Sequence, residues 1–238
     1  TGWTSVTLRF KEFDGDGHEI RNINYNGTGT AITVNTSNAT VKRTNFNNFI
    51  SAGSNSCFYK YTTGVLSFDE CNFAFDVNTS YIFNVSDASS YVVFNRCAFT
   101  LAGVVHNQFN RLASSGNRMT NCHINLANLK LPNAISGYQE VAFINLNATR
   151  VSILGKATKD ATGTVRWFSQ ASQCFVAVDM IDSAYKPTIF SNSNPTSPCF
   201  YDKDLMGETL TAQTNVHALT TEQCKDKDYL NSIGFVVV

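Results

Sequence analysis

The segment Asp14-Gly15-Asp16-Gly17 is the first whose residue types and spacing suggest chemistry, because alternating aspartates begin many calcium-binding loops. In an EF-hand loop that starts at Asp14, position 18 must supply an oxygen ligand and position 25 a glutamate. The chain has His18 and Tyr25 at these positions. We therefore expect a tight turn in which the glycines adopt positive φ, and we predict no metal site.

The histidines and serines match no complete catalytic motif. His18, His106, His123 and His217 lack the i, i+4 and H-x-E spacings of zinc sites. The segment Ser183-Ala-Tyr-Lys186 fits the S-x-x-K pattern of a serine nucleophile with a lysine base, but the S-D-N and K-T-G partner motifs are absent. The chain has neither a G-x-S-x-G elbow nor a Walker A loop, so we predict no cofactor.

Paired carboxylates are the strongest enzymatic candidates, because glycoside hydrolases act with two acidic side chains on one face of the substrate. The acidic residues that enter this comparison are Asp69, Glu70, Asp76, Asp179 and Asp182. Asp179 and Asp182 lie three residues apart, so a bend in the chain would bring them together as a catalytic pair. We assign no catalytic residue beyond these two candidates.

A loop with aromatic neighbours is the candidate ligand-binding region. The segment Gly155–Gly163 falls where the chain exceeds its regular spacing by about ten residues, which predicts an extra loop, and loops on a rigid scaffold often carry function. Lys156 and Lys159 suit hydrogen bonds to a glycan, and Trp167 and Tyr185 suit stacking on a sugar ring. We therefore predict that these four residues bind the ligand.

A sequence repeat must position these residues. Five copies of a short motif have apolar residues two apart with polar residues between them, which is typical of strands. The central residues of the copies are Thr44, Cys71, Cys97, Cys122 and Leu146. Their separations are 27, 26, 25 and 24 residues. A unit of this length cannot bury its own apolar face, so the copies must stack on one another.

We predict an all-β parallel solenoid of about seven coils over residues 1–187, each of about 25 residues. In this arrangement Cys71, Cys97 and Cys122 form an inward column. A second inward column contains Phe46, Phe73, Phe99 and Ile124. On the outside, the alignment of Arg43, Glu70 and Arg96, and of Lys42 with Asp69, places opposite charges on adjacent coils.

Composition excludes several classes of protein. The chain has 18 basic and 18 acidic residues, so it lacks the net charge expected of a nucleic-acid or anionic-membrane binder. No apolar run reaches the length of a membrane span, and the start Thr1-Gly2-Trp3 resembles no signal peptide. The seven cysteines contain no C-x-x-C pair, and we predict that most are free and buried.

The last part of the chain, residues 188–238, is predicted to cap the solenoid. The repeat is lost there, and Pro187, Pro195 and Pro198 follow a body with one other proline. Thr220-x-x-Gln223 fits a capping box and Gly234 fits a helix C-terminus, so we predict a short helix near 221–232. The other end lacks an obvious cap, so we expect it to continue from preceding sequence or to contact a partner.

The coil pattern resembles the single-stranded right-handed parallel β-helix of the pectate-lyase-like superfamily, which includes polysaccharide lyases, phage tailspikes and bacterial surface adhesins. The segment Phe13-Asp-Gly-Asp-Gly-His-Glu-Ile20 followed by Arg21-Asn-Ile23 resembles the FDGxGHxIxN opening of GLUG repeats. Residues 220–235 resemble the helical tail that follows the last coil of such proteins. The resemblance implies a protein at a cell surface or on a virion, trimeric if it is tailspike-like.

The leading functional hypothesis is a non-enzymatic recognition module that binds a glycan or a host surface, extracellular or virion-associated. The alternatives are a lyase or hydrolase acting on an extracellular polysaccharide, and a purely structural stalk segment. The absence of a carboxylate constellation and the exterior rich in asparagine, serine and threonine favour recognition. Free cysteines favour assembly in a reducing cytosol, as for a virion component.

Overall fold

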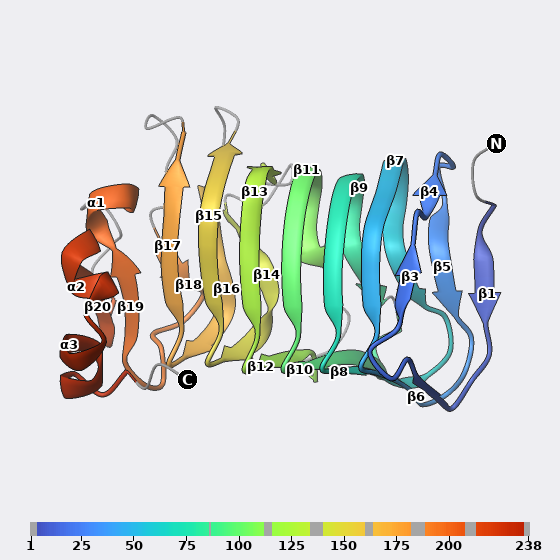
Figure 1. Cartoon of the computed structure of the whole chain (residues 1–238), viewed down its shortest axis with the longest axis horizontal. Helices are drawn as coiled ribbons and strands as arrows, with labels where there is room; N and C mark the ends of the chain where they lie inside the picture. Colours follow the sequence, from blue (N-terminus) through green and yellow to red (C-terminus); the bar gives the residue numbers. More distant parts are fainter. Residues whose placement is uncertain are drawn as a thin grey trace.

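The computed structural model shows a parallel β-solenoid of about seven coils with short helices at its C-terminal end (Figure 1), which confirms the predicted fold class. It describes residues 4–85, 87–111, 116–133, 140–159, 164–181, 189–207 and 213–235. Each coil contributes to two parallel sheets, so equivalent residues of successive coils lie in hydrogen-bonded rows.

Two sheets, named A and B, form the walls of the solenoid. Sheet A has the strand order β1 (Val6–Leu8), β5 (Thr30–Val34), β7 (Asn45–Lys60), β9 (Asn72–Val85), β11 (Ala98–Asn110), β13 (His123–Leu131), β15 (Ser152–Lys159), β17 (Phe175–Met180), β19 (Cys199–Asp202) and β20 (Val216–Leu219). The short strands β3 (Glu19–Arg21) and β4 (Asn24–Tyr25) also pair with β7. Sheet B has the order β18 (Ile189–Ser191), β16 (Thr164–Ser172), β14 (Glu140–Thr149), β12 (Arg118–Thr120), β10 (Ser90–Asn95), β8 (Gly64–Asp69), β6 (Ala39–Lys42) and β2 (Glu12–Asp14).

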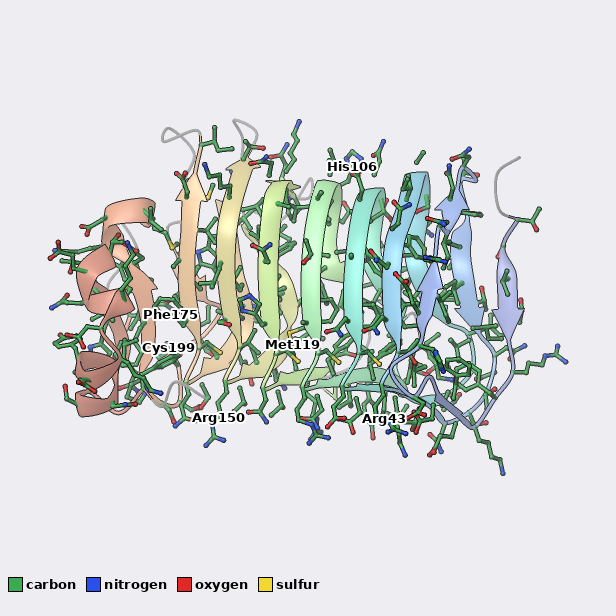
Figure 2. The ribbon with its side chains drawn as sticks, viewed as in Figure 1. Arg43, His106, Met119, Arg150, Phe175 and Cys199 are labelled. Carbon is green, nitrogen blue, oxygen red and sulfur yellow. The ribbon has the colours of Figure 1, made fainter. Side chains whose placement is uncertain are left out.

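One corner of the solenoid is formed by a single left-handed residue in each coil, between a strand of sheet B and the next strand of sheet A. We call these residues the corner column: Arg43, Glu70, Arg96, Asn121, Arg150 and Gln173, with φ between 43° and 55°. In the first five of these residues the backbone N–H group donates to a carbonyl of the following coil, as Arg43 N–H does to the carbonyl of Asp69 at 3.0 Å. The side chains of Arg43 and Arg150 point outward along the same edge (Figure 2).

The residue after each corner points into the core. This inward column contains Thr44, Cys71, Cys97, Cys122, Val151, Cys174 and Cys199. The predicted column of Cys71, Cys97 and Cys122 is confirmed, and all seven cysteines are free, six of them buried.

The predicted fifth copy, centred on Leu146, is wrong. Met119 pairs with Ala148 and Ile124 with Ile153, so the equivalent of Cys122 is Val151, which is five residues later. Leu146 is also buried, in the middle of the ten-residue strand β14. The sheet-B strand of this coil, β14, has ten residues, whereas β12 has three, and the repeat is displaced as a result. The apolar residues of β14 nevertheless match the pattern at the expected spacing.

The core of the first coils is an aromatic stack. The ring centroids of Phe46 and Phe73 lie 5.2 Å apart, and those of Phe73 and Phe99 lie 4.7 Å apart, with interplanar angles of 3° and 5°. The column then continues with aliphatic residues, Ile124, Ile153 and Val176, all fully buried. In-register stacking of this kind lets every coil cover the apolar face of its neighbour.

The predicted charge alignment is confirmed. Lys42 pairs in register with Asp69, and Arg96 contacts the carboxylates of Asp69 and Glu70, each at 2.9 Å. At the first corner, the turn Asp14–Gly17 is present, with φ of 49° at Asp16 and 81° at Gly17. A side chain at Gly15 would clash, because a Cβ there would lie 2.5 Å from the hydroxyl of Thr44.

The C-terminal end is closed by three short helices: α1 (Lys203–Met206), α2 (Thr221–Lys225) and α3 (Lys227–Ser232). They lie at the end of the stack opposite the N-terminus (Figure 1). The ladders continue past the expected boundary at residue 187, through β18, β19 and β20. The predicted capping box of Thr220 and Gln223 is present, but Asp226 interrupts the predicted helix by capping α3. No helix in the described ranges is long and apolar enough to cross a membrane.

Candidate functional site

The residues predicted to bind a ligand do not gather at one surface. The described part of the expected loop Gly155–Gly163, residues 155–159, belongs to strand β15, where Gly155 adopts a φ of 109°. Lys156 faces Asp179 on β17 in direct register, and their charged groups lie 3.6 Å apart. At residue 155 the strand lies so close to β13 that only glycine fits, because a Cβ there would lie 2.2 Å from the carbonyl oxygen of Leu126.

Two of the predicted residues are interior. Lys159 is 5% exposed and Trp167 is 0% exposed, with its indole nitrogen unpaired in the core. A buried indole offers no open face to a sugar ring. Tyr185 and the candidate acid Asp182 lie outside the described residues, as do residues 160–163. Asp179 has Lys156 as its ion-pair partner, and no group of three or more metal-ligating residues occurs in the described part of the chain.

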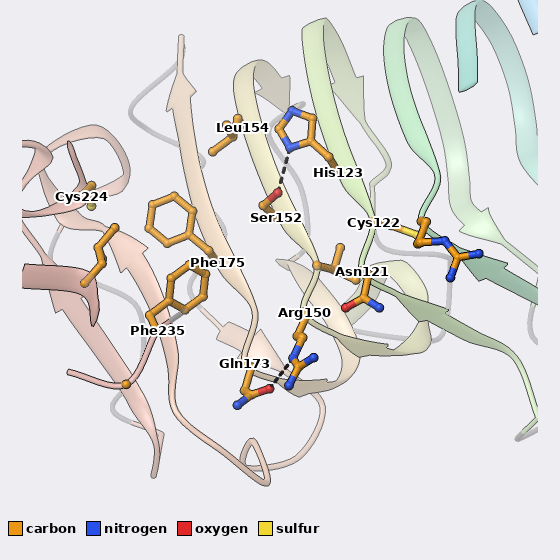
Figure 3. A pocket seen from close by; sticks show the side chains of 14 residues that line it. Asn121, Cys122, His123, Arg150, Ser152, Leu154, Gln173, Phe175, Cys224 and Phe235 are labelled. Carbon is orange, nitrogen blue, oxygen red and sulfur yellow. Dashed lines mark hydrogen bonds between the residues drawn. The ribbon is translucent and has the colours of Figure 1, made fainter. Parts of the chain in front are cut away.

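A groove of about 730 Å³ lies instead where the corner column of the later coils meets the C-terminal helices (Figure 3). Its floor is the outer surface of β13, β15 and β17. One end is formed by the corner column, and the opposite wall by Cys224, Leu230 and Phe235 of the C-terminal segment. Volumes of roughly 300–1,000 Å³ are typical of small-ligand sites.

The floor of the groove is a row of three equivalent positions. His123, Ser152 and Phe175 pair in register on β13, β15 and β17. They point outward because their neighbours Cys122 and Val151 fill the inward column. A ring nitrogen of His123, Nδ1, lies 2.8 Å from the hydroxyl oxygen of Ser152, and desolvation lowers the pKa of His123 below its ordinary value of 6.5. The imidazole is therefore mainly neutral at pH 7.

The far wall of the groove is aromatic and half-buried. The ring of Phe175 lies 5.8 Å from that of Phe235, which in turn packs edge-on against Phe200 at 5.4 Å. Leu230 anchors α3 in the same small cluster, and Leu154 completes the apolar surface beside Phe175. Through these contacts the segment that follows α3 packs on β17 and β19.

The other end of the groove is cationic. Arg96, Asn121, Arg150 and Gln173 of the corner column all line it, and Nε of Arg150 donates to the side-chain oxygen of Gln173 at 3.0 Å. Among the described residues that line the groove, none is acidic. The described lining therefore combines hydrogen-bond donors, an apolar ring face and positive charge, without a carboxylate.

Sequence reasoning missed this groove because its far wall comes from a segment that folds back onto the sheet. Two signals were nevertheless present. The outward row that contains Asn45, Asn72 and Ala98 changes to Phe175 near its end. The corner column keeps an arginine at position 150 but loses the acidic residues that accompany Arg43 and Arg96.

Comparisons with protein-family models, curated proteins and solved structures found no match to this chain. The parallel solenoid is therefore established by the strand order of the structure. The more specific resemblances, to pectate-lyase-like proteins, tailspikes and GLUG repeats, stay predictions from the sequence.

Proposed function

We propose that the protein is a non-catalytic recognition module that binds a glycan at a cell or virion surface, in the groove beside the C-terminal helices. The observation that carries this proposal is the composition of the groove. It offers a half-buried aromatic ring, Phe175, beside hydroxyl, amide and imidazole groups, and none of the described lining residues is acidic.

Each part of the groove suits a sugar. The C–H face of a pyranose packs on an aromatic ring, and Phe175 and Leu154 supply such a surface. Ser152, Asn121 and Gln173 can donate to and accept from sugar hydroxyls. All of them stand on β-strands or at a corner fixed by backbone hydrogen bonds, so little conformational entropy is lost on binding.

A polysaccharide lyase or hydrolase is the second candidate, because the parallel β-helix architecture also serves enzymes that act on polysaccharides. A hydrolase needs two carboxylates about 5–10 Å apart around the scissile bond. The described lining of the groove supplies none, and Asp179 lies on another outward row, paired with Lys156. A structural stalk is the third candidate, and it needs the stacked core but no groove.

The test is a glycan-array screen followed by a turnover assay on every hit, with reducing ends and unsaturated products measured. We expect binding without turnover. The variant Phe175→Leu keeps the apolar volume but removes the ring, and it should weaken binding several-fold, since ring stacking contributes about 0.5–1.5 kcal/mol. Tyr61→Leu is the matched control, because Tyr61 is 60% exposed on another coil, far from the groove.

The outcomes separate the three candidates. Product formation on a bound glycan would establish the enzyme, and absence of any glycan binding would leave the stalk. Equal weakening by Phe175→Leu and Tyr61→Leu would place the binding surface outside the groove.

A further inference from the structure

Resting on the proposed glycan-binding function, we propose that the groove selects an acidic sugar, whose carboxylate binds Arg150. The carboxylate would occupy the place that acidic side chains of the preceding coil occupy beside Arg43 and Arg96. The argument comes from three arginines at equivalent positions of one column, of which two have acidic partners within the protein.

Arg43 and Arg96 show what a corner arginine contacts in this fold. Arg43 lies 2.6 Å from a carboxylate oxygen of Asp14 and 3.1 Å from one of Asp16. Arg96 lies 2.9 Å from the carboxylates of both Asp69 and Glu70. In both cases the two acids belong to the preceding coil, and both of them form ion pairs with the same guanidinium.

Arg150 has the same backbone conformation, with φ of 53° against 43° and 51° at Arg43 and Arg96. The preceding coil, however, offers Thr120 and Asn121 where Asp69 and Glu70 stand beside Arg96. The register is the same, because Thr120 pairs with Thr149 as Asp69 pairs with Asn95. Arg150 bonds to the neutral Gln173 and makes no ion pair with any described residue.

The missing acids leave a position that opens into the groove. Asn121, Arg150 and Gln173 all line it, and Figure 3 shows their side chains together at one end. A guanidinium binds a carboxylate through two parallel N–H···O bonds, and the amide of Asn121 can donate a third. From that anchor, the floor of the groove leads past Ser152 to the ring of Phe175.

The electrostatics favour an anion over a neutral sugar at this end. The other guanidinium on the rim, Arg96, is already paired with Asp69 and Glu70, so Arg150 is the lining guanidinium that has no acidic partner among the described residues. Arg150 is exposed, so its guanidinium is accessible to a ligand from solution. The same solenoid position that stabilises the fold in earlier coils therefore becomes a ligand contact in this one.

The deciding variant is Thr120→Asp, which restores the acid that stands at the equivalent position of β8. The new carboxylate should pair with Arg150 as Asp69 pairs with Arg96, and so compete with the ligand. The probes are glucuronate- and sialate-terminated oligosaccharides, with their carboxyl-reduced and sulfated counterparts, measured by titration calorimetry. We expect Thr120→Asp to weaken binding of the carboxylated probes at least about tenfold.

Three controls accompany this variant. Ser67→Asp adds the same charge on the outer face of β8, away from the groove, and should leave binding unchanged. Arg150→Gln should reproduce the loss caused by Thr120→Asp, whereas Arg43→Gln removes a corner arginine outside the groove and should not. Wild-type protein should prefer each carboxylated probe to its carboxyl-reduced form, also by about tenfold or more.

The results also separate this inference from the function on which it rests. Binding of neutral sugars that Phe175→Leu weakens and Thr120→Asp leaves unchanged would keep the glycan-binding function and overturn the acidic-sugar assignment. Equal affinity for sulfated and carboxylated probes would overturn the choice of a carboxylate. Absence of binding to every probe would overturn both.

Discussion

The first and last coils of the solenoid share one backbone plan but differ in how they complete it. In the coils up to β11, every corner arginine is paired with acids and the core column is built of stacked phenylalanines. In the coils from β12 onward, Arg150 has a neutral partner and the column carries Ile124, Ile153 and Val176 before Tyr201. The repeat constrains inward residues in both regions, whereas the outer corner is free to change.

This difference explains why the groove lies near the C-terminal end. In the early coils the outward row beside the corner carries small polar residues such as Asn45 and Asn72, which hydrogen-bond to each other at 2.6 Å. In the late coils the row carries Phe175, and the C-terminal segment returns to pack on it through Phe235. The groove therefore forms at the end of the solenoid where this row no longer carries asparagines and Phe175 contacts the C-terminal segment.

The largest expected effect tests the packing of the aromatic column in the early coils. Phe73→Ala removes a buried ring stacked between two others, so it should lower the free energy of unfolding by about 3–5 kcal/mol. Ile153→Val, at the equivalent position of a late coil, should cost about 0.5–1.5 kcal/mol. Urea unfolding followed by circular dichroism measures both. A cost below about 1 kcal/mol for Phe73→Ala would contradict the packed column.

Much of the early-coil architecture could be predicted from the sequence, because each coil there repeats the same motif with a spacing of 25–27 residues. Cys71 and Phe73 are predictable from strand alternation alone. The spacing argument fails in the late coils because β14 is longer than the preceding strand of sheet B. The residue at the expected spacing is therefore Leu146, whereas Val151 is the residue in the inward column. Aliphatic residues lie at both positions, and composition alone cannot tell which one faces the inward column.

The candidate site was harder to predict, for a different physical reason. Lysines and aromatics in a stretch that exceeds the repeat suggested a loop, but Trp167 fills the core and Lys156 forms an ion pair on the sheet. The groove depends on Phe235 returning to Phe175 across 60 residues. Contacts between a sheet and a terminal segment leave no periodic signal, so spacing arguments do not find them.

The second prediction concerns the sulfur atoms of the inward column. Cys97→Ser should destabilise the fold by about 1–3 kcal/mol, because it places a hydroxyl in a site built for a thiol. The neighbouring thiol of Cys122 and burial together raise the pKa of Cys97 to about 12, so the thiol is neutral at pH 8 and reacts slowly with an alkylating reagent. Cys224→Ser, at a half-buried position in the cap, is the milder control. Rapid labelling of Cys97 in native protein would contradict its placement.

The third prediction uses the imidazole in the floor of the groove. Because desolvation lowers the pKa of His123 below its ordinary value of 6.5, the ring is neutral at pH 7.5 and gains a proton only when the pH falls to that lowered pKa. The added positive charge should tighten binding of a carboxylated sugar about two- to fourfold once the pH has fallen through the lowered pKa of His123. The thiol of Cys224, which also lines the groove, does not titrate in this range, because burial raises its pKa to about 12.

Titration calorimetry of wild-type protein and of His123→Gln between pH 5.5 and 7.5 separates this effect from a general one. The variant should bind with an affinity that does not change over this range. An equally steep pH dependence in His123→Gln would assign the proton to another group.

The smallest expected effect compares the two kinds of corner arginine directly. The side-chain hydrogen bond from Arg43 lowers the pKa of Asp14 below its ordinary value of 3.8. A carboxyl whose pKa is lower in the folded state stabilises the fold above the unfolded pKa, and this contribution is lost as the pH falls through the folded value. Arg43→Gln should therefore move the Asp14 midpoint up toward 3.8 in a carboxyl-detected NMR titration. Arg150→Gln should leave every described carboxyl midpoint unchanged, because Arg150 has no acidic partner among these residues. A shifted carboxyl in Arg150→Gln would reveal an internal partner and remove the distinction between the early and the late corners.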